Sequence, residues 1–349
     1  MDDDGVAPTP EETERIRSLL CAMQDEIQAR VTDARHRRSS RELSAIDAVT
    51  PSDTLYEIDR VGEEALLAWF EAHWPEAWPV ELILEGETAA PGETPRVPRG
   101  APDEALRFTC IIDPIDGTRS LMHDKRSAWV LSAVAPRPRR RRPRLRDTFV
   151  AAMTELPPTK QPLADQLSAV RGGGRAGLRA ERVDLRSGER RSFVPEPSTA
   201  IDLRHGFASF ARFFPEGKAL MAAFEEQLWE RLYGPPGDGA PLIFDDQYIC
   251  TGGQFYELLV GHDRLLGDLR PLAYAALGRS RSIQCHPYDA CTALILEEAG
   301  CRITAPNGAT LDFPLDTLTP VAWVGFANAA LEAHVRPALD AALRTSFGV

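Results

Sequence analysis

The sequence lacks the marks of several protein classes. Its six cysteines are scattered at positions 21, 110, 250, 285, 291 and 301 and form no Cys-x-x-Cys pair, which argues against a disulfide framework or a structural zinc site. No stretch reaches the roughly 20 consecutive apolar residues of a membrane span. The N-terminus, Met-Asp-Asp-Asp-Gly, has no basic and then apolar run typical of a signal peptide. We therefore expect a soluble, cytoplasmic protein with reduced thiols.

Positive charge is also in deficit. The 40 lysine and arginine residues face 52 aspartate and glutamate residues, which gives a formal net charge of -12. Nucleic acids and anionic membranes select clustered positive charge, so neither is an expected partner. Acidic clusters that bind cations fit this composition better. The chain of 349 residues, 43% of them hydrophobic, is long enough for a large buried core.

Hydrophobic periodicity predicts a mixed α/β protein. Apolar residues recur with the period of one helix face over residues 11–35, and a second helical pattern covers 57–72. Residues 80–84 and 108–112 are typical of strands, and the second is expected to stop at Asp113-Pro114. Further patterns predict strands at 127–135 and 148–153, hairpins within 158–200, a helix at 216–232, a turn at 251–254 between two apolar runs, and a helix at 288–299 capped by Gly300.

The most informative segment is Asp113-Pro114-Ile115-Asp116-Gly117-Thr118. It places two carboxylates three positions apart at the exit of a predicted buried strand, and hard divalent cations bind such oxygen ligands. Proline stiffens the turn, and glycine lets the backbone approach a ligand. On these residue types alone the preferred interpretation is simpler, namely that Asp116 caps a helix.

The same segment resembles a signature of the inositol monophosphatase and fructose-1,6-bisphosphatase superfamily. The stretch from Tyr288-Asp289 to Glu298-Ala299-Gly300 resembles the second signature of that family, and Val49-Thr50 followed by Asp59 and Glu63 follows its order. The resemblance covers most of the chain from residue 11 to about 330. It implies an α-β-α-β-α sandwich, with a short lead at 1–10, an N-terminal α+β half at 11–200 and a C-terminal α/β half at 201–349.

The resemblance also implies an activity, a phosphomonoester hydrolase that acts on a small phosphorylated polyol, sugar or nucleotide through metal-activated water. It would use two or three Mg²⁺ ions, with Mn²⁺ as a substitute, and would be sensitive to lithium. By position, Asp113 would bridge two ions, the Ile115 carbonyl and Glu85 would bind the first, and Asp116 and Asp289 would bind the second. Glu87 is the alternative to Glu85, because this chain has Glu-Gly-Glu where the family has two adjacent glutamates.

Further roles follow from the same resemblance. Thr118, hydrogen-bonded to Asp59, would orient the attacking water and accept its proton, and Asp113 would take part through the metals. The N–H groups of Gly117 and Thr118 would hold the phosphate. Substrate contacts are expected from Gly117, Thr118, Arg119, Gly253 and Gln254. Without the resemblance, Asp59 would be interpreted as an ordinary surface acid.

Several alternatives remain open at this stage. Ser120 and Leu121 depart from the family pattern, so a non-catalytic regulatory homologue that binds metal or phosphate is the second functional hypothesis. Cys285, His286 and Cys291 could bind zinc, although their spacing fits no common structural site. The family is often dimeric, so a homodimer is expected.

Two groups of basic side chains can each be interpreted in two ways. Arg119, Lys125 and Arg126 could hold a second anionic group of the substrate or be surface residues of a hairpin. The basic run Arg137–Arg146 is better explained as a solvated turn than as a polyanion site, because proline interrupts it within an acidic protein.

The residues that follow the turn at 251–254 are weaker candidates for substrate contacts. They are His262, Asp263, Arg264, Asp268 and Arg270.

Overall fold

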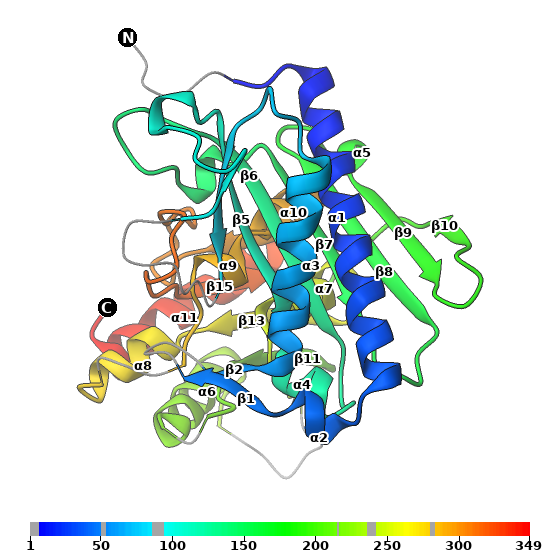
Figure 1. Cartoon of the computed structure of the whole chain (residues 1–349). Coiled ribbons are helices and arrows are strands. Elements are labelled where there is room, and N and C mark those ends of the chain that lie inside the picture. The colour runs from blue at the N-terminus through cyan, green and yellow to red at the C-terminus, as the bar shows by residue number, and fades with distance from the viewer. Residues whose placement is uncertain (1–6, 50–53, 86–93, 215, 236–241, 280–282) are drawn as a thin grey trace.

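Five alternating layers of helices and strands build the molecule, in the order α-β-α-β-α (Figure 1). The structure is a computed structural model, and it describes residues 7–49, 54–85, 94–214, 216–235, 242–279 and 283–349. The helices are α1 (Pro10–Arg37), α2 (Ser40–Leu43), α3 (Glu57–His73), α4 (Thr118–Met122), α5 (Gly174–Gly177), α6 (Lys218–Tyr233), α7 (Thr251–Leu259), α8 (Arg270–Ala276), α9 (Pro287–Ala290), α10 (Ala293–Ala299) and α11 (Ala329–Phe347). This layering confirms the fold class expected from the sequence.

The first sheet has eight strands in the order β10-β9-β8-β7-β6-β5-β3-β4. Its strands are β3 (Val80–Leu84), β4 (Arg96–Val97), β5 (Phe108–Asp116), β6 (Ala128–Pro136), β7 (Val150–Leu156), β8 (Leu163–Val170), β9 (Arg179–Asp184) and β10 (Arg190–Ser192). Only the pair β3 and β5 is parallel, and every other neighbouring pair is antiparallel. Strands β1 (Ile46–Val49) and β2 (Thr54–Tyr56) form a separate two-stranded sheet.

Helices α1 and α3 lie side by side across one face of this sheet (Figure 1). Alternate strand residues point to opposite faces, so Cys110 and Ile112 join the core beneath α1 and α3 while Ile111 joins the core on the other face. Helix α1 begins with a capping box, in which Thr9 Oγ1 accepts the Glu12 N–H at 3.1 Å and the Glu12 carboxylate accepts the Thr9 N–H at 2.9 Å. The expected first two helices are therefore confirmed.

The second sheet has five strands in the order β12-β11-β13-β15-β14. These are β11 (Gly206–Phe210), β12 (Ile243–Phe244), β13 (Asp263–Asp268), β14 (Arg302–Thr304) and β15 (Trp323–Phe326). Leu266 and Trp323 face the core that α7, α9 and α10 share with the first sheet, whereas Leu265 and Val324 face α6 and α11. The layer of α7, α9 and α10 thus joins the two sheets, and the candidate site lies there.

Three local predictions are wrong. Strand β5 does not stop at Asp113-Pro114 but runs to Asp116 with an irregular register. Residues 251–254 are not a turn between two segments, because they form the first turn of α7. The helix predicted at 288–299 is broken into α9 and α10 at residues 291–292, although Gly300 does adopt the left-handed capping conformation, with φ 91°.

The basic run 137–146 forms the connection between β6 and β7, and four of its seven arginines, Arg146 included, form ion pairs. Arg137 pairs with Glu81, Arg141 with Asp147, and Arg144 with Asp312 at 2.5 Å. These pairs fix the connection to the body of the protein and engage part of the charge that a polyanion would need. The geometry favours the interpretation of this run as a structural turn.

None of the described helices is long and apolar enough to cross a membrane.

Asp263 at the start of β13 provides a test of the electrostatics of the second sheet. The side chain is 7% exposed, and burial together with the charges of Glu257 and Asp246 raises its pKa to about 7. Because the folded-state pKa lies above the unfolded value, this carboxyl stabilises the fold while protonated, and that contribution is lost as pH rises towards 7. Asp263→Asn should therefore raise the free energy of unfolding by about 1–2 kcal/mol more at pH 8 than at pH 5. Urea unfolding at both pH values measures this difference, and an equal effect at both would contradict the assigned pKa.

Candidate metal centre

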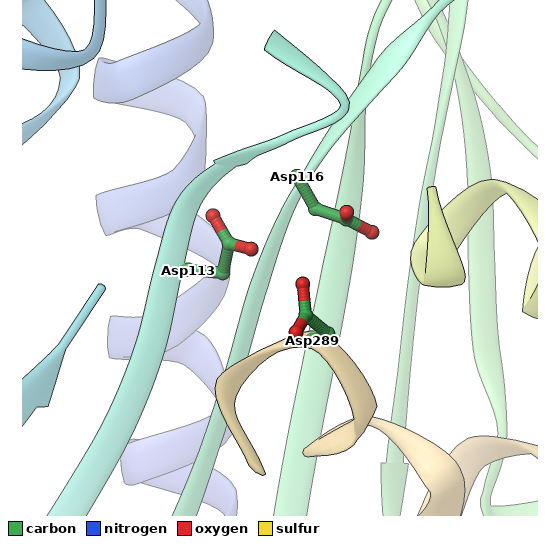
Figure 2. A group of neighbouring side chains, drawn as sticks. All are labelled: Asp113, Asp116 and Asp289. Atoms are coloured by element: carbon green, nitrogen blue, oxygen red, sulfur yellow. The ribbon is translucent and has the colours of Figure 1, made fainter. Parts of the chain in front are cut away.

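Three carboxylates from two distant parts of the chain meet between the sheets. Asp113 and Asp116 come from β5 and Asp289 comes from α9, and Figure 2 shows the three side chains directed towards one another. Each offers an oxygen atom, and these atoms all lie within 4.8 Å of one another. Among the described residues, no other group of three or more histidine, cysteine, aspartate or glutamate side chains is close enough to share a metal ion. Cys285, His286 and Cys291 form no such group there, so the geometry gives the zinc hypothesis no support.

A bulge in β5 brings Asp113 and Asp116 to the same side of the sheet. Residues three apart on a regular strand point to opposite faces. Here Asp113 pairs with Leu131 and Asp116 with Trp129, so three residue steps on β5 match two on β6. Leu131 and Trp129 both belong to the core between the sheets. The extra residue at Pro114-Ile115 therefore turns both carboxylates towards α9.

The first turn of α7 holds Asp116. The Gly252 N–H donates a hydrogen bond of 2.5 Å to Asp116 Oδ2, and the N-terminus of a helix favours a negative charge. A Cβ at position 252 would lie 2.8 Å from Leu131 and 3.0 Å from both Asp116 and Trp129. Glycine thus lets the helix N-terminus pack directly onto the two strands, and a larger residue would have to displace Leu131 and Asp116.

Asp289 is positioned within its own short helix. Its carboxylate accepts the His286 N–H at 2.6 Å, which fixes the side chain at the start of α9. Asp113 is 1% exposed, and its Oδ1 accepts the Ile115 N–H at 3.0 Å. Its Oδ2 is buried and accepts no hydrogen bond from the described residues. A buried carboxylate oxygen without a donor is costly unless a cation is bound to it.

The pKa values of the two β5 carboxyls reflect this crowding. Burial raises the pKa of Asp113 well above its ordinary value, and the charges of Asp116 and Asp289 raise it further, while contacts with Glu85 and the Ile115 N–H oppose the shift. Burial raises the pKa of Asp116 to about 7, against the lowering effect of the Gly252 and Thr251 N–H groups and of Arg270. Without a cation the cluster resists full ionisation, and a divalent cation would reverse that effect.

The other expected ligands and catalytic groups line the same pocket. They are Asp59, Glu85, Ile115, Gly117, Thr118 and Arg119. Glu85 lies beside Asp113, and the alternative ligand Glu87 falls outside the described residues. Thr118 Oγ1 lies 2.6 Å from Asp59 Oδ1, to which it donates, and 2.8 Å from the Ile115 carbonyl oxygen. The pairing of Thr118 with Asp59, 59 residues away, is the arrangement that the resemblance implies.

Other expected contacts are not brought to this pocket. Gly253 and Gln254 are buried within α7 and do not line it, so their assignment to substrate is not supported. Arg126 forms an ion pair with Asp246 at 2.5 Å, and together with Lys125 it lines a different depression of the surface. Only Arg119 of that cationic group reaches the metal pocket. Of the five weak candidates between His262 and Arg270, only Arg270 does.

The sequence interpretation missed a set of lining residues that carry no charge at neutral pH. They are Phe213, Phe214, Ile249, Cys250, Thr251, Ile283 and Gln284. They lie in connections that follow β11 and α8, or directly before and at the start of α7, and no periodic pattern marks them. Apolar residues next to a predicted helix are ordinarily assigned to the core, and isolated threonine or glutamine residues are common in loops, so no local pattern distinguishes these positions.

Comparisons with known proteins identify the fold. No protein-family model matches the chain, and no curated protein matches it in sequence. Fructose-1,6-bisphosphatase from Leishmania major in holo form is similar in structure, with a TM-score of 0.65 and 15% identity over 95% of this chain and 96% of that one. The extragenic suppressor protein suhB from Bartonella henselae gives a TM-score of 0.59 at 14% identity, over 93% of this chain and 98% of that one.

A third similar structure has metal and phosphate in its description. It is an IMPase/NADP phosphatase complexed with Mg²⁺ and phosphate, with a TM-score of 0.57 and 13% identity over 93% of this chain and 95% of that one. The low identities limit these likenesses to the fold. They confirm that the chain has the fold of the inositol monophosphatase and fructose-1,6-bisphosphatase superfamily, as the two sequence motifs indicated.

Proposed function

We propose that this chain, which has the fold just described, is a Mg²⁺-dependent phosphomonoester hydrolase that acts on a small phosphorylated polyol, sugar or nucleotide. The observation that carries the proposal is the cluster of Asp113, Asp116 and Asp289, whose oxygen atoms lie within 4.8 Å of one another. The similar structures include phosphatases of sugar and nucleotide phosphates, as their names state.

The residues present fit a hard divalent cation. The donor set is entirely oxygen, from carboxylates and the Ile115 carbonyl, as Mg²⁺ prefers. Asp113 Oδ2 is buried with no hydrogen-bond donor among the described residues, which is the state expected of an atom whose partner is a cation. Asp113, Asp116, Asp289 and Glu85 would hold the metal, which when bound would neutralise phosphoryl charge and make water a nucleophile at neutral pH.

The chain itself would supply the proton acceptor and the phosphate contacts. Thr118 can accept a proton from water only while its own hydroxyl proton is engaged elsewhere, and Asp59 provides that acceptor at 2.6 Å. Gly117, with φ 101°, turns the chain sharply after Asp116, so that the backbone of Gly117 and Thr118 lines the pocket at the metal cluster. A phosphoryl group bound at the metals would meet these N–H groups.

The non-catalytic alternative is less well supported. Its motivation was the separated pair Glu85-Gly86-Glu87 together with Ser120 and Leu121. Glu85 does line the pocket, whereas Ser120 and Leu121 are buried and do not. These departures therefore do not remove any group from the site.

Phosphate release from a panel of phosphomonoesters tests the proposal. The panel contains inositol 1-phosphate, fructose 1,6-bisphosphate, ribose 5-phosphate and the adenosine monophosphates, assayed with Mg²⁺, with Mn²⁺ and with chelator. We expect release with Mg²⁺, its loss on chelation, and its recovery when Mg²⁺ is restored. A folded protein that binds Mg²⁺ but releases no phosphate from any member would favour the regulatory alternative.

A further inference from the structure

The metal pocket has a second part whose chemistry differs from that of the carboxylate cluster. Its lining residues are predominantly apolar or aromatic: Phe213, Phe214, Ile249, Ile283 and Tyr288. Phe213 and Phe214 follow β11 directly and are half-buried. Their ring centroids lie 5.3 Å apart at an interplanar angle of 82°. The pocket therefore offers ring surface within the cavity that holds the candidate metal ligands.

Arg270 fixes these two rings in place. Its guanidinium carbon lies 4.8 Å from the ring centroid of Phe213 and 5.5 Å from that of Phe214. The guanidinium is held in turn by Asp268, whose oxygen atoms accept the Arg270 Nε–H at 2.9 Å, and by the Ile283 carbonyl at 3.2 Å. A cation over an aromatic face stabilises that arrangement, and a ring that is already ordered loses less entropy when a ligand stacks on it.

The carboxylates of this pocket are already engaged, although other polar residues, such as Gln284 and His286, also line it. Asp268 is 0% exposed and fully engaged by Arg270. Five described carboxylates line the pocket. Asp59 accepts a hydrogen bond from Thr118, Glu85 lies beside Asp113, and the other three form the metal cluster. A polyol would therefore find few carboxylate acceptors here, whereas a planar base would find both ring surface and the Gln284 amide.

We propose that the substrate is a nucleoside phosphomonoester whose base lies against Phe213 and Phe214. This inference rests on the proposed function and narrows it to one class of substrate. A nucleobase has a planar π-face, for which aromatic side chains are the usual partners. Gln284 lines the same pocket, and its side-chain amide has both a donor and an acceptor for the edge of a base.

Substrates with and without a base test the inference. The rate constant kcat/KM is measured for adenosine 2′-, 3′- and 5′-monophosphate, and for ribose 5-phosphate and glycerol 2-phosphate, which present primary and secondary phosphoesters without a base. We expect the best adenosine phosphate to exceed the better base-free substrate at least about tenfold, the usual effect of one stacking aromatic. Phe214→Leu, which keeps apolar bulk but removes the ring, should reduce that ratio to below about three, and Phe214→Tyr should preserve it.

Phe244→Leu provides the matched control. Phe244 lies on β12, is 42% exposed and does not line the pocket, so its replacement should leave the ratio unchanged. A ratio near one in the unaltered protein, or a ratio that Phe214→Leu does not change, would overturn the inference while leaving a phosphatase. If no substrate releases phosphate, the proposed function fails instead, and calorimetric binding of adenosine monophosphate against ribose 5-phosphate then decides whether the rings recognise a base.

Discussion

Asp113→Asn is expected to abolish Mg²⁺-dependent phosphate release and, at the same time, to raise the melting temperature of the metal-free protein. The loss of activity should be at least about a thousandfold, because a ligand at the centre of the cluster contributes several kcal/mol to transition-state stabilisation. The gain in stability follows from charge. Burial and the charges of Asp116 and Asp289 raise the pKa of Asp113, so a neutral amide relieves repulsion that only a bound cation would otherwise offset.

Thermal unfolding with and without Mg²⁺ measures the second effect. A ligand that binds only the folded state stabilises it by about 2.7 kcal/mol at a hundred times its Kd. The unaltered protein should therefore melt at higher temperature as Mg²⁺ is added, whereas Asp113→Asn should start higher and respond much less. Both observations together distinguish a metal ligand from a residue that merely supports the fold.

Asp165→Asn is the matched control for this experiment. Asp165 is as buried as Asp113, at 2% exposed, but Arg182 donates to both of its oxygen atoms at 2.7 Å and Tyr256 donates to Oδ2 at 2.6 Å. The same substitution there leaves a cation unpaired, so the melting temperature should fall while the response to Mg²⁺ persists. If Asp113→Asn behaved as Asp165→Asn does, the cluster would not be a metal site.

The sequence predicts the helices and strands of this fold better than it predicts the bulge and the helix start at which they pack together. Continuous apolar runs identify β5 and β6, because a strand that is buried on both faces is apolar along most of its length. The bulge at Pro114-Ile115 leaves no such pattern, since it depends on how β5 meets β6. Yet that single extra residue decides whether Asp113 and Asp116 can share a cation, so spacing alone could not have placed them.

The error at α7 has a related cause. Gly252-Gly253 is typical of a turn, because glycine destabilises a helix by about 1 kcal/mol relative to alanine. In the structure both glycines lie in the first turn of α7, where a Cβ at either position would clash, at 253 with Tyr248 at 2.1 Å. Tertiary packing overrides the local preference. The local sequence does not indicate that β6 and Tyr248 pack against these two glycines.

The resemblance, by contrast, predicted contacts that no local pattern could. Asp59 would have been interpreted as a surface acid, but it accepts a hydrogen bond from the hydroxyl of Thr118, which lies 59 residues away in the sequence. The substrate side of the pocket shows the opposite limit. Phe213 and Phe214 match no family motif, and the fold alone does not determine which molecule they contact.

A double-mutant cycle on Thr118 and Asp59 should show that the two residues act as one unit. Thr118→Ala removes the hydroxyl, and Asp59→Asn removes the charged acceptor while its side-chain oxygen can still accept the Tyr56 N–H that Asp59 caps at 2.7 Å. Each change should lower kcat/KM by about a hundredfold or more, the usual contribution of a positioned proton acceptor. The double variant should be no more than a few times slower than the worse single variant, because the hydroxyl and its acceptor serve one proton transfer.

Thr118→Ser separates this role from packing. Serine keeps the hydroxyl at the same position and loses only a methyl group, so it should recover most of the activity that alanine loses. Independent roles would instead give a double variant slowed by the product of the two single effects, about ten-thousandfold. That result would mean that Asp59 serves α3 alone and that the Ile115 carbonyl, 2.8 Å from the hydroxyl, is the acceptor that prepares Thr118 for catalysis.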